Sequence, residues 1–501
     1  MTETRARIAP SPTGPLHIGT ARTALFNYLF ARRTGGTFIL RLEDTDVARN
    51  TVAFEEDILT GLHWLGIEWD EGPDSAGGDD RGPFGPYRQM QRLERYAQAA
   101  EDLLKRDLAY PCYCTVEELE ADRKAHEAAH EPPRYVGRCA NLTPEERAAR
   151  EAEGRRPALR FRVPPGVVAF DDIVRGRVEI DAFNLGGDFV IVRSDGTPLY
   201  HFTVVVDDAA MEISHVIRGE DHLSNTPKHI LLFRALHHEV PAFAHLPLIL
   251  NPDRTKMSKR KSQTAISDYI AQGFIKEALV NYLALLGWST GTEEEILSLE
   301  ELTQRFDLEH VQKGGAVFDR ERLEWLNGQW IRKLEPDDLI ARLEPFLERE
   351  LEAGRIDRLP DPEELRPLLP IVQERLPRLD AVGDLIGFLW VDDLKPNPAL
   401  LVPKRWDAAT TRDGLNAARE TIAGSVSAVT FEADELEPPL RALADARGWK
   451  VGDLFMAIRV AVTGRTATPP LFDTLVALGR DRTLARLDRA IEILQQEVPV
   501  P

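Results

Sequence analysis

The pattern of apolar and polar positions near the N-terminus predicts a strand, a stiff loop and a helix in succession. Residues 5–9 form a short extended run, and residues 10–19, "PSPTGPLHIG", contain three prolines and two glycines. Apolar side chains then recur at helical spacing over residues 25–30, before a stop signal at Gly35. Open α/β sheets bind ligands outside the carboxyl ends of their strands, and a helix N-terminus attracts phosphate. The loop is therefore a candidate phosphate site, to which His17 would add a donor.

Farther along the chain, the same pattern predicts an α/β domain that is interrupted by an insert. Residues 37–46 read as a strand with acidic residues at its carboxyl end, and strand-like alternation returns over residues 198–221 and 246–250. Between them, residues 110–196 begin with a cysteine pair, continue as a polar helical stretch and become rich in β-forming residues. From about residue 270 to the end, nearly every segment has helical periodicity. The prediction is a split α/β domain that holds an insert and precedes a long helical region.

Composition places this chain among ordinary globular proteins. Its 501 residues suffice for several domains of about 150 residues each, and 43% of them are hydrophobic. No apolar run approaches the ~18 residues of a membrane span, and the N-terminus lacks the apolar segment of a secretory signal. Three cysteines, an odd number, favour a reducing cytoplasm over a disulfide framework. The net charge of −20 disfavours non-specific attraction to nucleic acid, although local basic patches remain compatible with it.

Residues that can do chemistry follow the predicted strands. Ser11 follows the first strand, Glu43 ends the second, and residues 218–221 end a strand expected at 213–217. The segment 251–262 follows the last strand, and its stretch "RTKMSKRK" holds five basic residues and no acid. Lysines beside a nucleotide stabilise negative charge that develops on transferring phosphates, although a lone basic run is more often a solvated loop. One crevice is thus expected to collect a carboxylate, arginines, a histidine and a lysine loop.

Other motifs are excluded or discounted. No two glycines stand two positions apart, which rules out a G-x-G-x-x-G fingerprint, and no G-K-[ST] is present for a Walker loop. The segment "HEAAH" at 126–130 matches the H-E-x-x-H pattern of zinc proteases. Because charged residues surround it and Pro132 follows at once, we interpret it as a chance match.

Two motifs in combination carry a resemblance to a known family. "PSPTGPLHIGT" at 10–20 and "KMSKR" at 256–260 resemble the two signature motifs of class I aminoacyl-tRNA synthetases. A wider set of segments resembles the bacterial glutamyl-tRNA synthetases: "RLEDTD", "LGIEWDEGP", "GPYRQ", "VVDD", "VIRGEDH" and "GGAVFD". Thr20 stands where the general class motif ends in histidine, a variation that occurs in this subfamily.

The resemblance implies an α/β fold with a split, Rossmann-like catalytic domain built on a parallel sheet. An α+β insert would interrupt this domain, and an all-α region that contacts the tRNA stem and the anticodon would follow it. The implied parts are the first catalytic half, the acceptor-binding insert, the second catalytic half with the KMSKR loop, the stem-contact region and the helical anticodon-binding region, at residues 1–109, 110–196, 197–270, 271–335 and 336–501.

The resemblance also implies a glutamate–tRNA ligase, an AMP-forming enzyme of protein biosynthesis. It would join L-glutamate to tRNA(Glu) in two ATP-dependent steps through glutamyl-adenylate, and would discriminate against tRNA(Gln). A non-discriminating ligase that also charges tRNA(Gln) is one alternative, and a small-molecule nucleotidyltransferase with the same two motifs is an alternative of a different class. The implied partners are tRNA(Glu), L-glutamate and ATP with Mg²⁺, and we expect a cytoplasmic monomer without membrane contact.

The family's functional residues carry over onto matching positions of this chain. Those implied to act on the ATP phosphates and the departing pyrophosphate are His17, Lys256 and Lys259. Those implied to bind ATP more widely are His17, Gly19, Asp221, Leu248, Ile249, Met257 and Lys259. Those implied to bind glutamate are Arg7, Ala9, Ser11, Glu43, Tyr200 and Arg218. Ser11 and Glu43 would hold the ammonium group, and the arginines with Tyr200 would hold the carboxylates. Surface ion pairing for the arginines, helix capping for Glu43 and core packing for Tyr200 are the structural alternatives.

A metal site in the insert is a further hypothesis. Some relatives hold zinc here with a C-x-C and a later C-x-H, but this chain has Asn141 at the place of that histidine. The residues that would offer ligands to a tetrahedral structural Zn²⁺ are Cys112, Cys114, Cys139 and Tyr135, with His126 or His130 as other candidates for the fourth position. Three reduced thiols without a metal are the alternative.

In the helical region, the resemblance places Arg378, Arg459 and Leu471 at the anticodon. Arg378 aligns with the part that reads the third anticodon base, where the glutamate and glutamine anticodons carry cytosine and guanine. A guanidinium can donate to both N3 and O2 of cytosine, whereas guanine presents N–H donors at the matching positions. Arg378 is therefore predicted to favour tRNA(Glu). The alternative is a surface arginine that balances Glu374 and Asp380.

Overall fold

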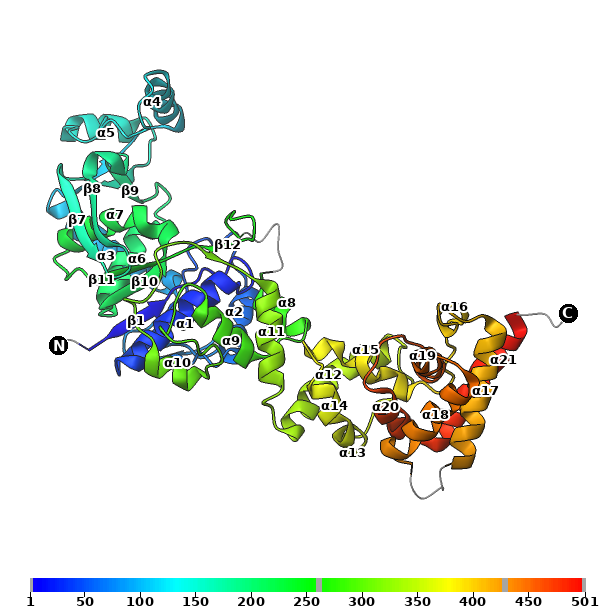
Figure 1. Cartoon of the computed structure of the whole chain (residues 1–501). Helices are drawn as coiled ribbons and strands as arrows, with labels where there is room; N and C mark the ends of the chain where they lie inside the picture. Colours follow the sequence, from blue (N-terminus) through cyan, green and yellow to red (C-terminus); the bar gives the residue numbers. More distant parts are fainter. Residues whose placement is uncertain (1–2, 258–263, 426–430, 498–501) are drawn as a thin grey trace. The chain divides into compact units, whose positions relative to one another are not determined.

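The structure is a computed structural model that describes residues 3–257, 264–425 and 431–497. The chain divides into two compact units, Met1–Tyr269 with Lys276–Arg320, and Ile270–Ile275 with Glu321–Pro501. The β-strands of the described residues all belong to the first unit, and the second is helical (Figure 1). The predicted α/β region followed by a helical region is confirmed, while the finer division into five parts stays a prediction.

The first unit is built around a six-stranded sheet with the order β2-β1-β10-β11-β7-β8. Neighbouring strands are parallel except for β8, which runs antiparallel to β7. The strands are β1 (Arg5–Ile8), β2 (Thr37–Leu40), β7 (Val167–Asp172), β8 (Gly176–Asp181), β10 (His215–Gly219) and β11 (Ala242–Leu246). Because β2 lies on one side of β1 and β10 on the other, the carboxyl end of β1 is a topological switch point, where such sheets bind ligands.

Helix α1 (Ile18–Arg33) follows the Pro- and Gly-rich loop and packs on this sheet. The apolar residues that predicted it, Leu25, Phe26 and Leu29, are fully buried. Arg32 and Arg33 lie in its last turn, where positive charge interacts favourably with the helix dipole. The predicted succession of strand, loop and helix is therefore confirmed.

The strand-like alternation over residues 198–221 predicts strand throughout, and only its second half is a strand. Its second part contains β10, but its first part is helix α6 (Tyr200–Ala210). The residues from Phe202 to Asp208 are buried in succession, so α6 is covered on all sides. A helix buried all round shows no polar face, and a run of valines in it cannot be told from a strand by periodicity.

The strand predicted at 246–250 is also interrupted. β11 ends at Leu246, and β12 (Ile249–Leu250) pairs with β13 (Ala316–Val317) in a separate two-stranded sheet. Pro247 lies between them, has no amide hydrogen for a sheet ladder, and its carbonyl accepts a hydrogen bond from Arg22. The chain therefore leaves the main sheet at this proline.

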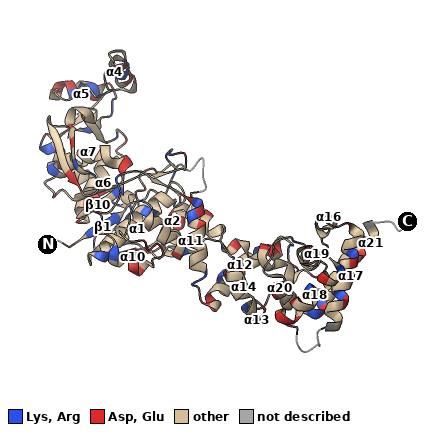
Figure 2. Cartoon of the chain, in the orientation of Figure 1, with Lys and Arg blue, Asp and Glu red and all other residues tan. Residues whose placement is uncertain are grey.

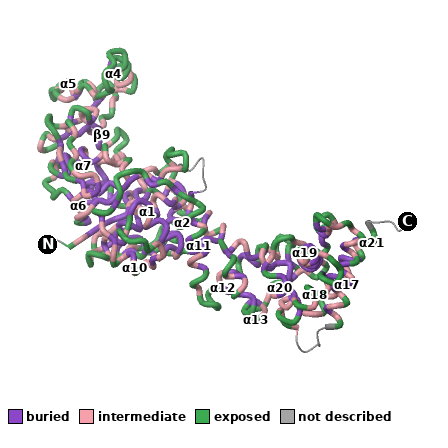
Figure 3. The backbone as a smooth tube through the Cα atoms, in the orientation of Figure 1, coloured by how far each residue is buried: buried purple, intermediate pink, exposed green. Residues whose placement is uncertain are grey.

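The insert contributes strands to two different sheets. β5 (Ala109–Cys112), β6 (Ala158–Phe161) and β9 (Phe189–Val192) form a three-stranded antiparallel sheet. In contrast, β7 and β8 extend the edge of the main sheet, where β7 pairs with β11. The helices α4 (Val116–Ala128) and α5 (Pro144–Ala152) are largely exposed, green in Figure 3, whereas the main sheet and α1 form a buried centre. Participation of the insert in the main sheet was not predicted.

Shorter elements complete the first unit. They are α2 (Val52–Trp64), β3 (Gly72–Pro73), β4 (Asp80–Arg81), η1 (Gln89–Gln91), α3 (Leu93–Lys105), η2 (Ala182–Leu185), η3 (Glu220–Asn225), α7 (Thr226–Ala235), α9 (Lys276–Leu285) and α10 (Leu299–Arg305). The first four residues of α8 (Ile266–Ala271) also belong to this unit, and its last two belong to the second.

The second unit consists of helices around an apolar core. Acidic and basic residues are interspersed along these helices (Figure 2) and form ion pairs such as Arg441–Glu437 and Arg419–Asp488. The elements are α11 (Arg320–Ile331), α12 (Pro336–Glu352), α13 (Pro362–Leu365), η4 (Arg366–Leu368), α14 (Leu369–Gln373), η5 (Leu379–Ala381), α15 (Val382–Ile386), η6 (Gly387–Trp390), α16 (Pro398–Leu401), α17 (Ala408–Ser425), α18 (Ala433–Arg447), α19 (Val451–Thr463), α20 (Leu471–Leu478) and α21 (Arg480–Glu497). None of the helices within the described ranges combines the length and the apolar character needed to cross a bilayer.

Candidate active site

A cavity of about 800 Å³ opens at the carboxyl ends of β1 and β10. It is lined by residues that the sequence predicted for the site and that come from segments far apart in the chain: Arg7, Ala9, Ser11, His17, Gly19, Glu43, Tyr200, Arg218, Asp221, Leu248, Ile249, Lys256 and Met257. Lys259, predicted for the same site, lies outside the described residues. The structure thus brings together every predicted glutamate- and ATP-binding residue that it describes, while their individual roles stay predictions.

His17 is the N-cap of α1, a role that the sequence did not predict. Its Nδ1 accepts hydrogen bonds from the backbone amides of Gly19 at 3.1 Å and Thr20 at 3.3 Å. Nδ1 therefore carries a lone pair and the proton of the neutral ring is on Nε2, which lies 3.1 Å from Thr20 Oγ1. His17 thus occupies two helix amides that were expected to face phosphate, and its Nε2–H is directed at Thr20 Oγ1.

Gly19 lies directly beside the ring of His17. A Cβ atom at this position would lie 3.0 Å from both Cε1 and Nδ1 of His17. Any larger residue would therefore press on the imidazole that caps the helix. This contact with His17 is sufficient by itself to favour glycine at position 19.

A buried network of charges forms one wall of the cavity. Arg7 donates to both oxygens of Asp208, from Nε at 3.0 Å and from Nη2 at 3.1 Å. Arg41, which is fully buried, donates to Asp208 at 2.7 Å and to Glu43 at 3.2 Å. Although burial opposes ionisation, the two arginines hold the pKa of Asp208 below its ordinary value. Burial raises the pKa of Glu43 despite the nearby positive charges of Arg41 and Arg7.

Arg218, near the end of β10, has a different environment. It is 6% exposed and donates to Thr226 Oγ1 at 2.8 Å, to His229 Nδ1 at 3.2 Å and to His245 Nε2 at 3.3 Å. Tyr200 lines the same part of the cavity, and its hydroxyl lies 3.0 Å from His222 Nδ1. Burial raises the pKa of Tyr200 to about 12, so its phenol is neutral at physiological pH.

The flanks of the lysine loop are tied to the first motif. The amide of Ile18 donates to the carbonyl of Thr264 at 2.8 Å, just beyond the residues that the structure leaves undescribed. On the other flank, Met257 donates from its backbone to Ile249 at 3.1 Å, and Lys256 Nζ lies 3.0 Å from Asp221 Oδ2. These contacts hold Lys256, Met257 and Thr264, which flank the undescribed stretch 258–263, at the cavity.

Several residues of this site were not predicted as functional. Asp208 and Arg41 lie within the quoted motifs "VVDD" and "RLEDTD", which therefore contained the signal without a role attached to it. The histidines around Arg218 gave no local signal. Because His229 and His245 come from α7 and β11, only the folded sheet brings them to the arginine.

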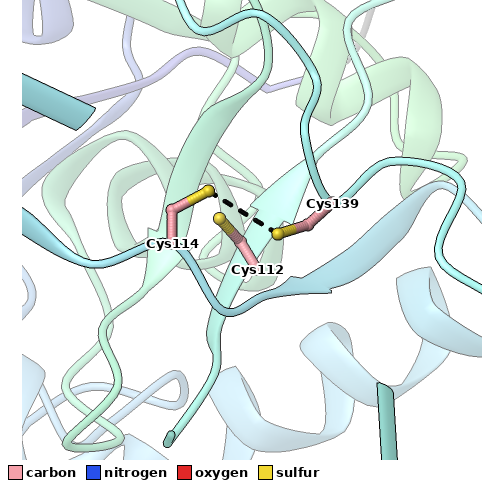
Figure 4. Close-up of side chains that lie close together, drawn as sticks. All are labelled: Cys112, Cys114 and Cys139. Atoms are coloured by element: carbon pink, nitrogen blue, oxygen red, sulfur yellow. Dashed lines mark hydrogen bonds between the residues drawn. The ribbon is translucent and has the colours of Figure 1, made fainter. Parts of the chain in front are cut away.

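The three cysteines of the insert converge on one point (Figure 4). Their sulfur atoms lie within 4.8 Å of one another, and the Sγ atoms of Cys114 and Cys139 are 3.6 Å apart. The Tyr135 hydroxyl lies 3.5 Å from Cys112 Sγ and 3.7 Å from Cys114 Sγ. Burial would raise the pKa of Cys112, but its hydrogen bonds with Tyr135 and Arg160 lower it below its ordinary value.

The histidines proposed as alternative ligands lie apart from this cluster. Among the described His, Cys, Asp and Glu residues, only the three cysteines place their ligand atoms within it. His126 instead has Nδ1 3.1 Å from Glu131 Oε2, and His130 follows the end of α4. The chance-match interpretation of "HEAAH" agrees with this placement.

The predicted anticodon residues are engaged within the second unit. Arg378 donates to Glu324 at 2.7 Å and to Asp380 at 3.0 Å. Its predicted alternative partner Glu374 lies instead near Arg332, so that part of the expectation was wrong. Arg459 donates to the carbonyl of Pro469 at 2.8 Å.

Leu471 begins α20 and is 4% exposed. Such burial suits packing within the helical core, because little of the side chain is available to contact a base.

Comparison with known proteins agrees with this geometry. Residues 3–325 match the family described as tRNA synthetases class I (E and Q), catalytic domain, and residues 338–491 match the anticodon binding domain. The glutamate–tRNA ligase of Moorella thermoacetica is 43% identical over 99% of this chain and 100% of its own length. That of Symbiobacterium thermophilum is 44% identical over 96% of this chain and 98% of its own.

A solved structure gives the same result. The crystal structure of a glutamate tRNA ligase from Elizabethkingia meningosepticum, in complex with its amino acid, has a TM-score of 0.86 and 32% identity to this chain. It covers 98% of this chain and 100% of that one. The catalytic and anticodon-binding matches together with these nearly full-length relatives show that the chain belongs to the class I aminoacyl-tRNA synthetases, as a member of the bacterial glutamate–tRNA ligases.

Proposed function

We propose that this chain charges tRNA(Glu) with L-glutamate in two ATP-dependent steps, as a monomer in the cytoplasm, and discriminates against tRNA(Gln). The observation that carries the proposal is the convergence of the predicted residues. Side chains implied to bind an amino acid and those implied to bind ATP line one cavity of about 800 Å³ at the switch point of the sheet. Membership of the glutamate–tRNA ligases supplies the reaction class.

The charges of the cavity suit a dicarboxylic amino acid. Glu43 and Ser11 are proposed to hold the ammonium group, because both line the cavity and the carboxylate of Glu43 is a natural partner for a positive charge. Arg7 uses Nε and Nη2 on Asp208, which leaves Nη1 for the α-carboxylate among its described contacts. Arg218 is proposed to bind the side-chain carboxylate through a bidentate pair, with Tyr200 beside it.

The chemistry requires positioning and charge stabilisation more than proton transfer. In the first step, an oxygen of the glutamate α-carboxylate attacks the α-phosphorus of ATP, and pyrophosphate leaves. In the second, a terminal ribose hydroxyl of the tRNA attacks the carbonyl of the mixed anhydride, and AMP leaves. His17, Lys256 and Lys259 are proposed to stabilise negative charge on the phosphates. Mg²⁺ is expected to accompany ATP as the counter-ion of its phosphates.

The remaining regions are proposed to bind the tRNA. The insert at 110–196 would hold the acceptor end, residues 271–335 the stem, and residues 336–501 the anticodon. A chain of net charge −20 can bind RNA in this way because phosphate contacts require only local positive charge.

A charging assay with glutamate, glutamine and both tRNAs tests the proposed function. The expected product is glutamyl-tRNA(Glu) alone, formed with release of AMP and pyrophosphate. Charging of both tRNAs with glutamate would establish the non-discriminating alternative. Adenylation of a small acceptor without any charging of tRNA would establish the nucleotidyltransferase alternative instead.

Zinc binding by the insert is supported by the geometry of the cysteines. Tetrahedral zinc with Zn–S bonds of about 2.3 Å places its sulfur ligands about 3.8 Å apart. The Cys114–Cys139 separation of 3.6 Å and the distances of Tyr135 from two sulfurs, 3.5 and 3.7 Å, are close to that value. The three cysteines therefore fit the metal, and the Tyr135 oxygen would be its fourth ligand. When bound, zinc would join β5 to the loop that carries Cys139.

Elemental analysis of protein purified without chelators is expected to find about one zinc per chain. The control is Cys139→Ser, which removes one ligand and is expected to lower the zinc content. An equally low content in the two proteins would establish reduced thiols without metal.

Discrimination between the two tRNAs is proposed to depend on Arg378. Support comes from its position just before η5 in the anticodon-binding region and from a side chain that is one quarter exposed. Reading a cytosine requires that the base edge replace Asp380 or Glu324 on this arginine, because the described contacts occupy Nε, Nη1 and Nη2. A base that replaced Asp380, which accepts from both Nε and Nη2, would need to offer two acceptors, as cytosine does.

Arg378→Gln is expected to lower the preference for tRNA(Glu) over tRNA(Gln) by about 1–3 kcal/mol, the usual worth of one base-edge contact. The measurement is the ratio of kcat/KM for the two tRNAs. Arg375→Gln is the matched control, since Arg375 is exposed and lies three residues away. If the ratio in Arg378→Gln equals the wild-type ratio, Arg378 does not read the anticodon and its ion pairs serve only to stabilise the helical unit.

A further inference from the structure

Neutral groups hold Arg218 in place. Its three side-chain hydrogen-bond partners are the hydroxyl of Thr226 at 2.8 Å, His229 Nδ1 at 3.2 Å and His245 Nε2 at 3.3 Å. The carbonyl of His222 lies at 3.4 Å. Within the described part of the chain, no carboxylate accepts a hydrogen bond from this guanidinium. Arg218 is nevertheless only 6% exposed to solvent. An arginine so buried is ordinarily paired with an acid.

The contacts determine where the histidines carry their protons. Arginine has donors only, so each imidazole nitrogen that faces Arg218 must be an unprotonated acceptor. His245 then has its proton on Nδ1, 2.6 Å from Asp172 Oδ2. His229 has its proton on Nε2, which donates to His201 Nδ1 at 3.1 Å. Burial and the charge of Arg218 also lower the pKa of His229 well below its ordinary value. Both rings are neutral in this arrangement.

The neighbouring arginines show what Arg218 lacks. Arg7 and Arg41 share Asp208, and Arg41 also pairs with Glu43, so their charges are balanced inside the protein. Around Arg218, Thr226 and the two histidines direct the guanidinium and are themselves neutral, and the carboxylate of Asp172 behind them pairs with His245 and not with the arginine. A bound anion is therefore the group that completes this site, and an uncharged amide in its place would leave the arginine buried without compensation.

We propose that His229 and His245 are positioning residues that set the specificity of the site for an anionic side chain over an amide. They accept hydrogen bonds from Arg218 in place of a carboxylate, which orients the arginine while preserving its charge for the substrate. The inference rests on the proposed role of Arg218 in glutamate binding, and it adds the reason why glutamine is refused.

The test compares His229→Asn with His229→Asp. Both side chains can place an oxygen near the position of Nδ1, and they differ only in charge. The carboxylate introduced by His229→Asp would form an ion pair with Arg218 and take the place of the substrate carboxylate. We therefore expect kcat/KM for glutamate to be at least about 100-fold lower in His229→Asp than in His229→Asn. The loss is expected in KM for glutamate, with KM for ATP unchanged. The preference for glutamate over glutamine should narrow only in His229→Asp. Equal values for the two variants would overturn the inference.

A control and a second measurement keep this test decisive. His238→Asp adds the same charge at an exposed position just beyond α7 and is expected to leave kcat/KM at the wild-type value. If His229→Asp does not fold, ¹⁵N spectra of histidine-labelled wild-type protein at neutral pH give the answer directly. They are expected to show His229 protonated on Nε2 and His245 on Nδ1. A doubly protonated ring at either position, or the opposite tautomer, would overturn the inference.

Arg218→Gln in the same assay separates this inference from the proposed function. If Arg218→Gln keeps the wild-type preference for glutamate over glutamine, the role of Arg218 itself is wrong. If Arg218→Gln loses that preference while His229→Asp equals His229→Asn, the role of Arg218 stands and only the role of the histidines is wrong.

Discussion

Replacing Arg218 by cysteine is expected to nearly abolish the use of glutamate while leaving the protein folded. The substrate carboxylate would then be buried in the cavity without a positive partner. Breaking a buried ion pair in this way costs about 3–5 kcal/mol, which corresponds to a loss of roughly two to three and a half orders of magnitude in kcat/KM. The measurement is kcat/KM for glutamate at saturating ATP and tRNA.

The fold is expected to survive because of the neutral surroundings of Arg218. Its described partners are a hydroxyl, imidazoles and a carbonyl, so the substitution leaves no buried carboxylate unpaired. An unchanged melting temperature and an unchanged KM for ATP are therefore the controls. A variant that retains the wild-type kcat/KM for glutamate would remove Arg218 from the substrate site.

Replacing Arg41 by methionine is expected to cause a large loss of stability, whereas replacing Arg218 by cysteine leaves the melting temperature unchanged. Arg41 is fully buried and donates to Asp208 at 2.7 Å and to Glu43 at 3.2 Å. Methionine fills similar space but leaves these carboxylates buried with less compensation, which costs about 3–5 kcal/mol. Loss of Arg41 also removes an influence that lowers the pKa of Glu43, so the carboxylate proposed to bind the substrate ammonium will protonate more readily.

Amide hydrogen exchange of β1 and β10 measures this loss in the first unit alone, which matters in a chain with two units because a single unfolding transition is not assured. Arg49→Met is the matched control. It removes an arginine that pairs with Asp46 on the surface, and no change in the exchange of β1 or β10 is expected. Similar exchange in Arg41→Met and wild-type protein would show that the buried network does not stabilise the sheet.

The parts of the site that sequence could predict are those carried by short local patterns. His17 and Ser11 lie in a loop whose prolines and glycines are visible in the sequence, and Lys256 lies in a conspicuous basic run. Their roles could be expected because each pattern lies next to a recognisable strand or helix. The capping role of His17 could not, since it depends on the rotamer of a single ring.

Residues that act through others were beyond the reach of sequence. Asp208 contacts Arg7 across 201 positions of the chain, and Asp172 contacts His245 across 73. Neither pair has a sequence spacing that periodicity can detect. The same holds for α6, whose buried valines resemble a strand, and for β7, which leaves the insert to join the main sheet.

The order of strands in the main sheet has a consequence for synthesis of the chain. β1 is made at residues 5–8, but its neighbour β10 begins only at residue 215. At about 5–20 residues per second, the ribosome needs roughly 10–40 s to produce the chain between them. During that time β2 is the only neighbouring strand of the main sheet with which β1 can pair. The apolar residues of both strands cannot yet be buried by the rest of the sheet. The insert is therefore complete in the nascent chain before the centre of the catalytic sheet can close, and it supplies the edge strands against which β11 then forms.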